Sequence, residues 1–321
     1  MTKRAASGVN NMEKIEITDK ILLGKIADME NIPSVGAYNI RKNSASAGRR
    51  NTENIEITNK TDKQGIDIHI KPNTKSESVH IPVIINASGV EEVVYNDFYI
   101  GDDCDITIVA GCGIHNDGCD NSRHDGVHRF FIGKNAKVKY IEKHYAEGKG
   151  SGEKIMNPVT KIYVGEGSVC ELEMLQLGGV DKTKRDTYAK IEKNAKIIIT
   201  ERLLTLDNQV ADSDMVTELV GENAVAQIIS RSVAKGNSYQ IFRPKAVGNA
   251  KCKAHVQCDS IICDNAKIAS VPEIAANHPE ANLIHEAAIG RINNDQLLKL
   301  MTLGIPEDEA EDVIIQGFLG K

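Results

Sequence analysis

The residues with the clearest capacity for chemistry lie near the C-terminal end of the chain. Cys252, Cys258 and Cys263 share one short stretch, and the pair His285-Glu286 follows it. Soft thiolate beside imidazole and carboxylate suits iron or an iron–sulfur cluster. The alternative is that these cysteines are small apolar residues of half-buried strands, because free cysteine is among the most buried residue types. Without a Cys-x-x-Cys pair, the spacing alone favours this structural interpretation.

A second group of potential ligands lies in the segment GCGIHNDGCDNSRHDGVH, from Gly111 to His128. With Cys104 just before it, the segment contains Cys112, His115, Cys119, His124 and His128. Their spacings match no zinc-finger pattern, so a metal held by this segment alone is the less favoured interpretation. Cys112 stands between two glycines, which would leave its thiol sterically open. A histidine or lysine that lowered its pKa would make it a good acceptor of sulfane sulfur.

The composition narrows the class of protein. The chain has 321 residues and a net charge of −6, which disfavours broad nucleic-acid binding through a basic face. Aromatic residues make up 4% and tryptophan is absent, so the core must consist mostly of Val, Ile, Leu and Ala. Seven widely spread cysteines are a poor disulfide framework. We find no apolar run of signal-peptide or membrane-spanning length. We therefore expect a cytoplasmic protein with reduced thiols and no membrane partner.

A recurring motif predicts the elements that position these residues. Each copy is an apolar residue, a tight polar turn and an alternating strand, the pattern of half-buried strands. Successive copies lie 26 to 32 residues apart, except for a shorter last step. The copies begin at Ile100, Ile132, Val164, Ile191, Val220, Ala246 and Ile262. A period of this size is the signature of stacked coils that bury their apolar faces against one another.

The sequence therefore predicts a mainly β protein with a β-solenoid, or β-helix, core over residues 54–292. The asparagines of the repeat are suited to turn positions with positive φ. These are Asn135, Asn194, Asn223, Asn249 and Asn265.

The two ends differ from the core. Residues 1–53 read as an N-terminal tail and a short helical and loop region, with a helix from Thr18 or Asp19 through Asp28 and a loop from Gly36 to Arg50. Residues 293–321 predict two helices separated by Gly304 and Pro306. The second helix is acidic, so the pair suits a cap for the solenoid or a docking site for another protein, but not DNA reading.

Motifs for nucleotide or hydrolytic chemistry are missing from the sequence. We find no P-loop, no GxSxG elbow, no HExxH and no GxGxxG after a strand. If the protein's function requires ATP, a partner must hydrolyse it.

The C-terminal region carries a series of short motifs in the order Cys258-Asp259-Ser260, Val271-Pro272-Glu273-Ile274, His285-Glu286-Ala287, Ile289 to Ile292, Asp295-Gln296-Leu297 and Leu303-Gly304-Ile305. Taken in this order, the motifs resemble the core domain of the SufB/SufD family of iron–sulfur cluster assembly proteins. The similarity extends back through NPVTK and IVAGCGIH to about Val83, roughly three-quarters of the chain.

This resemblance implies a β-helix core and a non-enzymatic scaffold that carries a transient iron–sulfur cluster. The scaffold would dimerise, with itself or with a second SufB/SufD-type subunit, and would work with a sulfur donor protein. Its C-terminal helices would bind a SufC-type ATPase through Leu297, Leu298, Ile305 and Phe318.

By motif position, Cys112 matches the sulfur acceptor of the family. His128, Lys161 and His144 match its internal sulfur route. Cys258, Glu286 and His285 match the residues that hold the nascent cluster. Because both cysteines and the glutamate are present, the chain resembles SufB more than SufD. Its short N-terminal region resembles minimal systems of one SufB-like chain and one ATPase. A flavin is compatible with the family, but no motif in this chain indicates one.

Two other functions remain open on the sequence. A SufD-like subunit would dock the ATPase and stabilise the complex without binding a cluster, and a buried, unreactive Cys258 would favour it. A carbohydrate-acting β-solenoid enzyme would need paired carboxylates on one exposed face. An exposed cluster of Glu173, Glu201 and Asp207 would favour that function.

Overall fold

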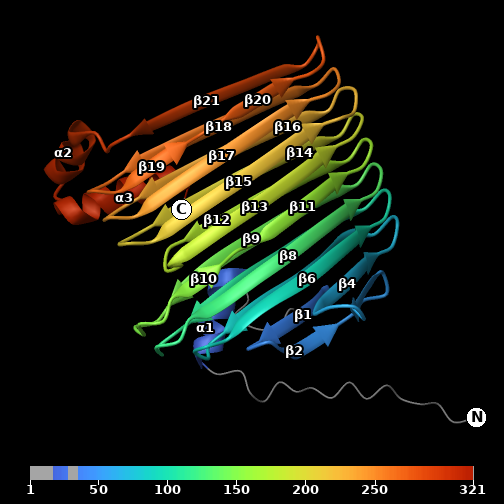
Figure 1. Ribbon diagram of the computed structural model, residues 1–321, viewed down its shortest axis with the longest axis horizontal. Coiled ribbons are helices and arrows are strands. Elements are labelled where there is room, and N and C mark those ends of the chain that lie inside the picture. The colour runs from blue at the N-terminus through green and yellow to red at the C-terminus, as the bar shows by residue number, and fades with distance from the viewer. Residues whose placement is uncertain (1–16, 28–34, 321) are drawn as a thin grey trace, which may run out of the picture.

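The computed structural model describes residues 17–27 and 35–320, and two stacked sheets wind into a β-solenoid (Figure 1). Sheet A has ten strands, in the spatial order β2 (Ala45–Arg50), β1 (Ala37–Lys42), β5 (Lys75–Ile85), β7 (Asp105–His115), β9 (Lys137–Glu147), β12 (Val169–Leu177), β14 (Lys196–Thr205), β16 (Val225–Ala234), β18 (Lys253–Ile262) and β21 (Asn282–Gly290). Sheet B contains β3 (Ile55–Asn59), β4 (Gly65–Ile70), β6 (Glu91–Ile100), β8 (Ser122–Ile132), β10 (Lys154–Met156), β11 (Val159–Val164), β13 (Lys182–Ile191), β15 (Val210–Leu219), β17 (Tyr239–Gly248), β19 (Lys267–Ser270) and β20 (Glu273–Ala276). The predicted β-solenoid is confirmed.

The sequence repeat is the coil of the solenoid. Ile100 pairs with Ile132, Ile132 with Val164, and Val164 with Ile191, so the first copies stack in direct register. The last copy is different, because Ile262 lies at the end of β18 in sheet A and pairs with Ala234. The short final step of the repeat is therefore a crossing from one sheet to the other.

The turns confirm part of the asparagine prediction. Asn135, Asn194 and Asn223 have φ values of 52°, 56° and 60°, in the left-handed region that asparagine tolerates. Asn249 and Asn265 do not have positive φ, so the prediction is wrong for them. At the turn after β18, Asp264 takes the left-handed position instead, with φ of 54°.

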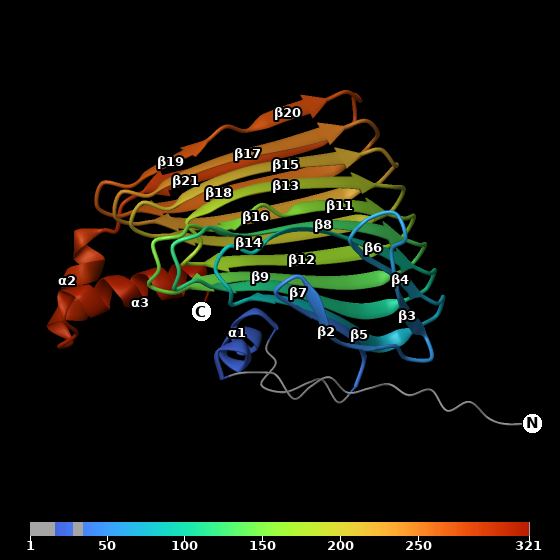
Figure 2. The same ribbon diagram turned by 60° about the horizontal axis from the view of Figure 1, so that its bottom comes forward.

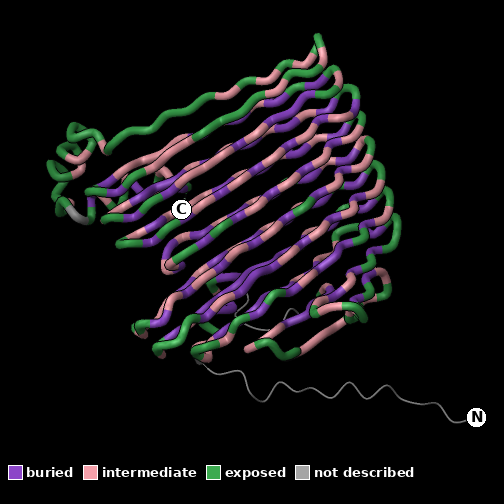
Figure 3. The backbone as a smooth tube through the Cα atoms, in the orientation of Figure 1, coloured by how far each residue is buried: buried purple, intermediate pink, exposed green. Residues whose placement is uncertain are grey.

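Alternation along each strand divides the interior into rows, and the buried and half-buried residues alternate visibly in Figure 3. One side of the interior is apolar, for example where Phe98 stacks on Phe130 with ring centroids 4.4 Å apart. The opposite side is polar. One of its rows in sheet A runs from Ala110 through Glu142, Met174, Glu201 and Ser230 to Cys258. The next row contains Cys112 and His144.

The N-terminal region differs from the predicted loop. Ala37–Lys42 and Ala45–Arg50 form an antiparallel hairpin that joins the edge of sheet A. The predicted loop from Gly36 to Arg50 is therefore wrong. The predicted helix is present as α1 (Ile17–Ala27), and its predicted end at Asp28 lies outside the described residues. Its buried Asp19 binds Lys42 at 2.6 Å and Asn86 at 2.8 Å, which fixes the helix to the solenoid.

Three helices of the described residues lie outside the two sheets. Helix α1 packs against β5, β7 and β9, and α3 (Glu307–Leu319) packs against β16, so both cover the outer face of sheet A (Figure 2). The predicted C-terminal pair is confirmed, because α2 (Asn294–Thr302) begins after an Asn293 cap and precedes α3. None of the helices in the described part of the chain is long and apolar enough to cross a membrane.

The contact of α1 with sheet A depends on two glycines of β7. A Cβ atom on Gly111 would lie 2.4 Å from the carbonyl oxygen of Ile26 and 2.8 Å from the Cβ atom of that residue. On Gly113 it would lie 3.2 Å from the Cβ atom of Leu22. The glycines therefore allow close packing of the helix on the outer face, while the Cys112 side chain between them points inward.

Replacing Gly111 with alanine should weaken this packing. We expect Gly111→Ala to lower the free energy of unfolding by about 1–3 kcal/mol, because the added methyl group overlaps α1. Hydrogen exchange should increase in α1. The matched change Gly24→Ala places a methyl group on α1 where nothing lies within 4 Å. It should raise helix stability by up to about 1 kcal/mol. Equal urea denaturation midpoints for the two variants would contradict this account.

Candidate functional site

Two small cavities lie on the polar side of the interior. The first, the Cys112 cavity, is about 10 Å³ and is lined by Cys112, His124, Gly126, His128, Glu142 and His144 with neighbouring apolar residues. The second, the Cys258 cavity, is also about 10 Å³, and its lining includes Glu201, Ser213, Ser230, Gln240, Cys258 and Ser270. Each has room for about one water molecule. Both predicted functional cysteines therefore face small polar spaces inside the solenoid.

Cys112 is enclosed. Its exposed fraction is 2%, and burial, together with Glu92 and Glu142, raises the pKa of the thiol well above its ordinary value. The expectation that flanking glycines leave the thiol sterically open is wrong, and the condition of a lowered pKa is not met. The glycines accommodate α1 on the outer face, and the thiol is protonated inside the core at neutral pH.

Two histidines of β8 face the same cavity and have different partners. Nδ1 of His124 lies 3.0 Å from Oε1 of Glu92, whose other oxygen binds Arg41 at 2.9 Å. Burial alone would raise the pKa of Glu92, but its bonds to His124 and Arg41 lower that pKa to about 2. Nδ1 of His128 lies 2.7 Å from the Tyr140 hydroxyl, and burial lowers the pKa of His128 to about 4.

A buried arginine connects the two cavities. Nη1 of Arg185, on β13, donates to Glu142 at 3.0 Å, and Nη2 lies 3.3 Å from Nδ1 of His144. Nε of the same guanidinium lies 3.6 Å from Glu201, which lines the Cys258 cavity. Burial disfavours the Glu142 charge, but His144, Arg185 and His128 hold the pKa of that carboxyl far below its ordinary value. A continuous buried ionic network therefore runs from one cysteine cavity to the other.

At the far end of this network, Cys258 meets His285. The Cys258 Sγ atom lies 3.3 Å from Nε2 of His285, on the neighbouring edge strand β21. Cys258 is 4% exposed, and burial with the nearby Glu201 charge raises the pKa of its thiol to about 12. Burial and His255 lower the pKa of His285, so a neutral thiol faces a neutral imidazole.

The structure does not bring Glu286 to this pair. Glu286 pairs in register with Gln257 and therefore projects from the opposite face of sheet A to Cys258. Its carboxylate is 65% exposed and lies 3.4 Å from Nε2 of His255. The carboxylate that shares the Cys258 cavity is Glu201.

Other predicted residues are also separated from the cavities. Lys161 is exposed on the outer face of β11, between the buried Thr160 and Ile162, so it does not line the interior with His128 and His144. The segment around Cys112 is not an open loop, because most of it forms β7 and β8. At the turn between these strands, Cys119 is exposed and His115 pairs with Asp117 and Glu147.

The described residues contain no group of three or more His, Cys, Asp or Glu side chains at metal-binding spacing. Cys258 and His285 supply soft and borderline donors suited to cluster iron, but only two of them. A cluster at this position would therefore need further ligands, from a second chain or from the cluster's own sulfide. The carboxylates expected of a carbohydrate-acting enzyme are not grouped, because Glu201 is buried inside while Glu173 pairs with Lys139 outside.

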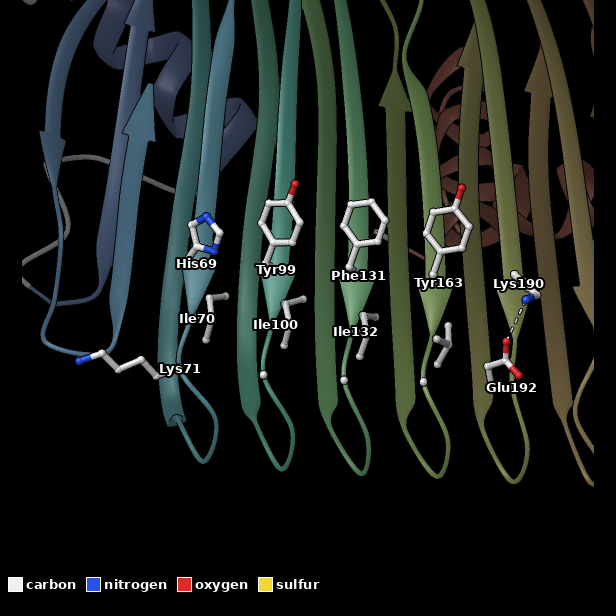
Figure 4. Close-up of a pocket in the computed structure, with 14 residues that line it drawn as sticks. His69, Ile70, Lys71, Tyr99, Ile100, Phe131, Ile132, Tyr163, Lys190 and Glu192 are labelled. Carbon is white, nitrogen blue, oxygen red and sulfur yellow. Dashed lines mark ion pairs between the residues drawn. The ribbon is translucent and has the colours of Figure 1, made fainter. Parts of the chain in front are cut away.

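A larger hollow of about 580 Å³ lies on the outer face of sheet B, away from both cavities (Figure 4). It follows a ladder of rings, His69, Tyr99, Phe131 and Tyr163, with successive centroids 4.7, 5.2 and 5.3 Å apart. The rings stack on one another along the solenoid, so most ring faces are already covered. We interpret the ladder as a structural feature of the stacked coils.

Two residues of the network, Glu92 and Arg185, are not among the candidates from the sequence, and Glu201 is named there only as a possible exposed carboxylate. All three lie in strands that read as ordinary alternating surface strands. The pattern that could have found them is their position in the strand alternation. Arg185, for example, is two residues from Thr183 and from Thr187, so it lies on the same buried face of its strand. Charged residues in the buried phase of a strand are unusual and point to an ionic partner inside.

Together these features define a class: a parallel β-solenoid protein whose interior carries a polar connection between two buried cysteines. Comparison with known proteins then gives the family. The family model for the SufBD core domain of the SUF system for iron–sulfur cluster assembly matches residues 83–318. The chain therefore belongs to the SufBD family of iron–sulfur cluster assembly proteins.

Curated proteins named as iron–sulfur cluster assembly SufBD family proteins are similar over most of the chain. One from Archaeoglobus fulgidus is 30% identical over 269 residues, covering 82% of this chain and 71% of that protein. One from Methanocaldococcus jannaschii is 31% identical over 247 residues, covering 75% and 76% respectively. One from Pyrococcus horikoshii is 26% identical over 282 residues, covering 85% and 84%.

The buried arginine gives a first test of the site. Arg185→Met should lower the free energy of unfolding by about 3–5 kcal/mol, because it leaves Glu142 and Glu201 without their shared cation. Adding Glu142→Gln should recover part of the loss. The matched control Arg243→Met removes an arginine that is 40% exposed and should change stability far less than Arg185→Met. Similar losses in urea denaturation for both single variants would contradict the network.

The buried histidine gives a second test. The pKa of His128 falls from 6.5 to about 4 on folding, so the unfolded chain binds more protons between these values and stability decreases as pH falls through this window. In His128→Gln this decrease should be shallower, by at most about 1.4 kcal/mol per pH unit.

The control His115→Gln should act in the opposite sense. Burial lowers the pKa of His115, but its bonds to Asp117 and Glu147 outweigh burial and raise that pKa. The stabilisation from His115 is therefore present at low pH and lost as pH rises through the folded pKa. Urea denaturation at a series of pH values measures both slopes. Parallel pH profiles for wild type and His128→Gln would contradict the burial of a neutral His128.

Proposed function

We propose that this chain is a scaffold subunit for iron–sulfur cluster assembly that accepts sulfur at Cys112 and builds a nascent cluster at Cys258. The observation that carries the proposal is the buried network in which Glu142, Arg185 and Glu201 join the two cysteine cavities. The family membership supports the same function. The protein would act in the cytoplasm without catalysing a reaction of its own.

The register of sheet A supports transfer through the interior. Cys112 and Cys258 are in adjacent rows and five strand spacings apart, a separation of about 24 Å along the solenoid. Thiolate and persulfide groups carry negative charge, and the Arg185 cation stands between Glu142 of the first cavity and Glu201 of the second. The surrounding sheets would shield that species from free thiols and water. His128 and His144 line the first part of this route.

The cluster end is incomplete in a single chain, which suits a scaffold that must release its product. Cys258 and His285 lie beside the free edge of sheet A, where β21 is the last strand. Apolar side chains are exposed around this end, including Ile274 at 43%, Ile284 at 48% and Ile289 at 45%. We propose that a second copy, or a related subunit, covers this end and completes the ligand set. Glu286, on the other face, would contribute only within such an assembly.

The C-terminal helices suit a protein partner. No residue of α2 is buried, and Leu298 and Leu303 are 56% and 78% exposed. Leu297 and Ile305 are half-buried, whereas Phe318 packs towards the solenoid beside Ile315 and Leu319. We propose that α2 and its following turn bind a SufC-type ATPase, which would supply the ATP hydrolysis.

One observation favours a second candidate function. Cys258 is almost fully enclosed and its pKa is raised to about 12, so its thiol is unreactive in this conformation. A SufD-like subunit, which would stabilise the complex without binding a cluster, would not need a reactive thiol at Cys258. The two functions differ in whether Cys258 ever holds iron.

Anaerobic reconstitution separates these candidates. Purified wild type, incubated with iron and sulfide, should gain visible charge-transfer bands and bound iron and sulfide, and Cys258→Ala should lose them with its fold intact. Cys252→Ala is the matched control, because Cys252 is also buried in this region but does not line the Cys258 cavity. A cluster in Cys258→Ala would overturn the site. No cluster in wild type, even with the ATPase present, would favour the regulatory subunit.

A further inference from the structure

Sulfur acceptance at Cys112 requires a base, because burial raises the pKa of its thiol and the thiolate is the nucleophile. Three histidines face its cavity, His124, His128 and His144. The other charged groups around it are Glu92 from β6, Glu142 from β9 and Arg185 from β13. The hydrogen bonds of the three rings decide which of them can accept a proton.

Two of the rings are poorly suited to this role. The nitrogens of His144 are both engaged, because Nδ1 lies 3.3 Å from the Arg185 guanidinium and Nε2 lies 3.4 Å from Glu142. That arrangement fixes the proton on Nε2 and directs the free pair of Nδ1 to the arginine. His128 is held only by the neutral Tyr140 hydroxyl, and burial makes it a weak base.

His124 has the arrangement of a general base. Glu92 accepts from Nδ1, and Arg41 and Gln64 hold that carboxylate at 2.9 and 3.4 Å. A carboxylate on one ring nitrogen fixes the tautomer and stabilises the imidazolium that forms when the other nitrogen takes a proton. Nε2 of His124 makes no hydrogen bond with any residue in the described part of the chain.

The free nitrogen of His124 points into the cavity. A Cβ atom on Gly126 would lie 3.4 Å from Nε2 of His124 and 3.1 Å from Nε2 of His128, so both nitrogens border the space above this glycine. Cys112 lines the same cavity, which has room for one water molecule. A base separated from its acid by one water is within reach for proton transfer.

We propose that Cys112, His124 and Glu92 form a nucleophile–base–orienter set, in which His124 takes the thiol proton directly or through one water molecule. This proposal rests on the proposed function for the identity of the electrophile, a sulfane sulfur. The activation of the thiol does not depend on it.

The step balances without an external oxidant or reductant. The Cys112 thiolate attacks the terminal sulfur of a persulfide donor, and a new sulfur–sulfur bond forms at Sγ. The sulfur–sulfur bond of the donor breaks, and its electron pair leaves with the donor sulfur as a thiolate. The proton held on Nε2 of His124 then neutralises that thiolate. Glu92 acts as a positioning residue, because it touches only His124 in this set.

The test measures the rate at which a small neutral sulfur electrophile, methyl methanethiosulfonate, modifies Cys112 in the full-length protein as a function of pH. Mass spectrometry of the digested protein resolves each cysteine. Cys170, buried in the core without a histidine partner, serves as an internal control for opening of the fold. We expect Cys112 to react faster than Cys170 in wild type, and we expect this difference in rate to depend on the His124 side chain.

The principal variant is His124→Asn, whose side-chain amide can still donate to Glu92. It should slow Cys112 modification about a hundredfold at neutral pH, leaving only the alkaline rise of the thiol itself. Glu92→Gln should slow it in the same direction by disturbing the tautomer, and provides a second variant if His124→Asn folds poorly. His115→Gln, which changes a histidine outside the cavity, should leave the rate and pH profile unchanged.

Two results would overturn the proposal. In one, Cys112 reacts no faster than Cys170 in wild type. In the other, folded His124→Asn retains the wild-type rate and pH profile. A separate reaction with inorganic polysulfide tests the proposed function. If Cys112 shows His124-dependent modification but gains no sulfur from polysulfide, the base assignment stands and sulfur acceptance fails. If Cys112 gains sulfur from polysulfide equally in wild type and in His124→Asn, sulfur acceptance stands and the base assignment fails.

Discussion

The guanidinium of Arg185 holds the two halves of the buried polar interior together. It lies between carboxylates from two strands of the opposite sheet, with Glu142 on one side and Glu201 on the other. Removing charged groups from water is costly, and apolar residues of similar volume would usually fill such a space with equal or better stability. The charges are therefore not explained by folding alone. Their position between two cysteine cavities, in a chain of the SufBD family, supports the proposed transfer of sulfur through this interior.

The parallel coil is what makes a connection of this length practical. Each turn of the solenoid places one more residue in the same interior row, so polar residues can recur along one row over several coils. The row that contains Glu142 and Glu201 also contains Met174 and Cys258, and Cys112 lies in the adjacent row. The apolar rows on the other side, including the stacked Phe98 and Phe130, supply the hydrophobic burial that keeps the coils together.

The architecture could be predicted from the sequence because the repeat in the sequence corresponds to the stacked coils of the solenoid. The positive φ of Asn135, Asn194 and Asn223 follows from the same turn chemistry. The hairpin at Ala37–Arg50 is not predicted because ASAGRR, which forms β2, has no apolar alternation. Its formation depends on the pairing of β2 with β1 and of β1 with β5, which are tertiary contacts. The site was predicted only in part. Alternation tells which residues share a face of one strand, but it cannot give the register between strands.

The expectations that Glu286 lies beside Cys258 and that Lys161 lies beside the interior histidines fail because they depend on this register. The missing register also explains why Arg185 was overlooked, since its partner Glu142 lies 43 positions away and in the other sheet.

The two cysteines share an electrostatic design that bears on how such a protein is controlled. Each thiol is enclosed, has a raised pKa and faces at least one imidazole that burial keeps neutral. A neutral thiol beside a neutral imidazole carries no net charge into the core, so the resting state avoids the cost of a buried ion pair. Reaction then requires a proton shift that is favourable only when an electrophile or a metal ion stabilises the thiolate. Each thiol is therefore held in its unreactive form in this conformation, and under the proposed function it would react only when its substrate arrives, which would protect the interior from random oxidation.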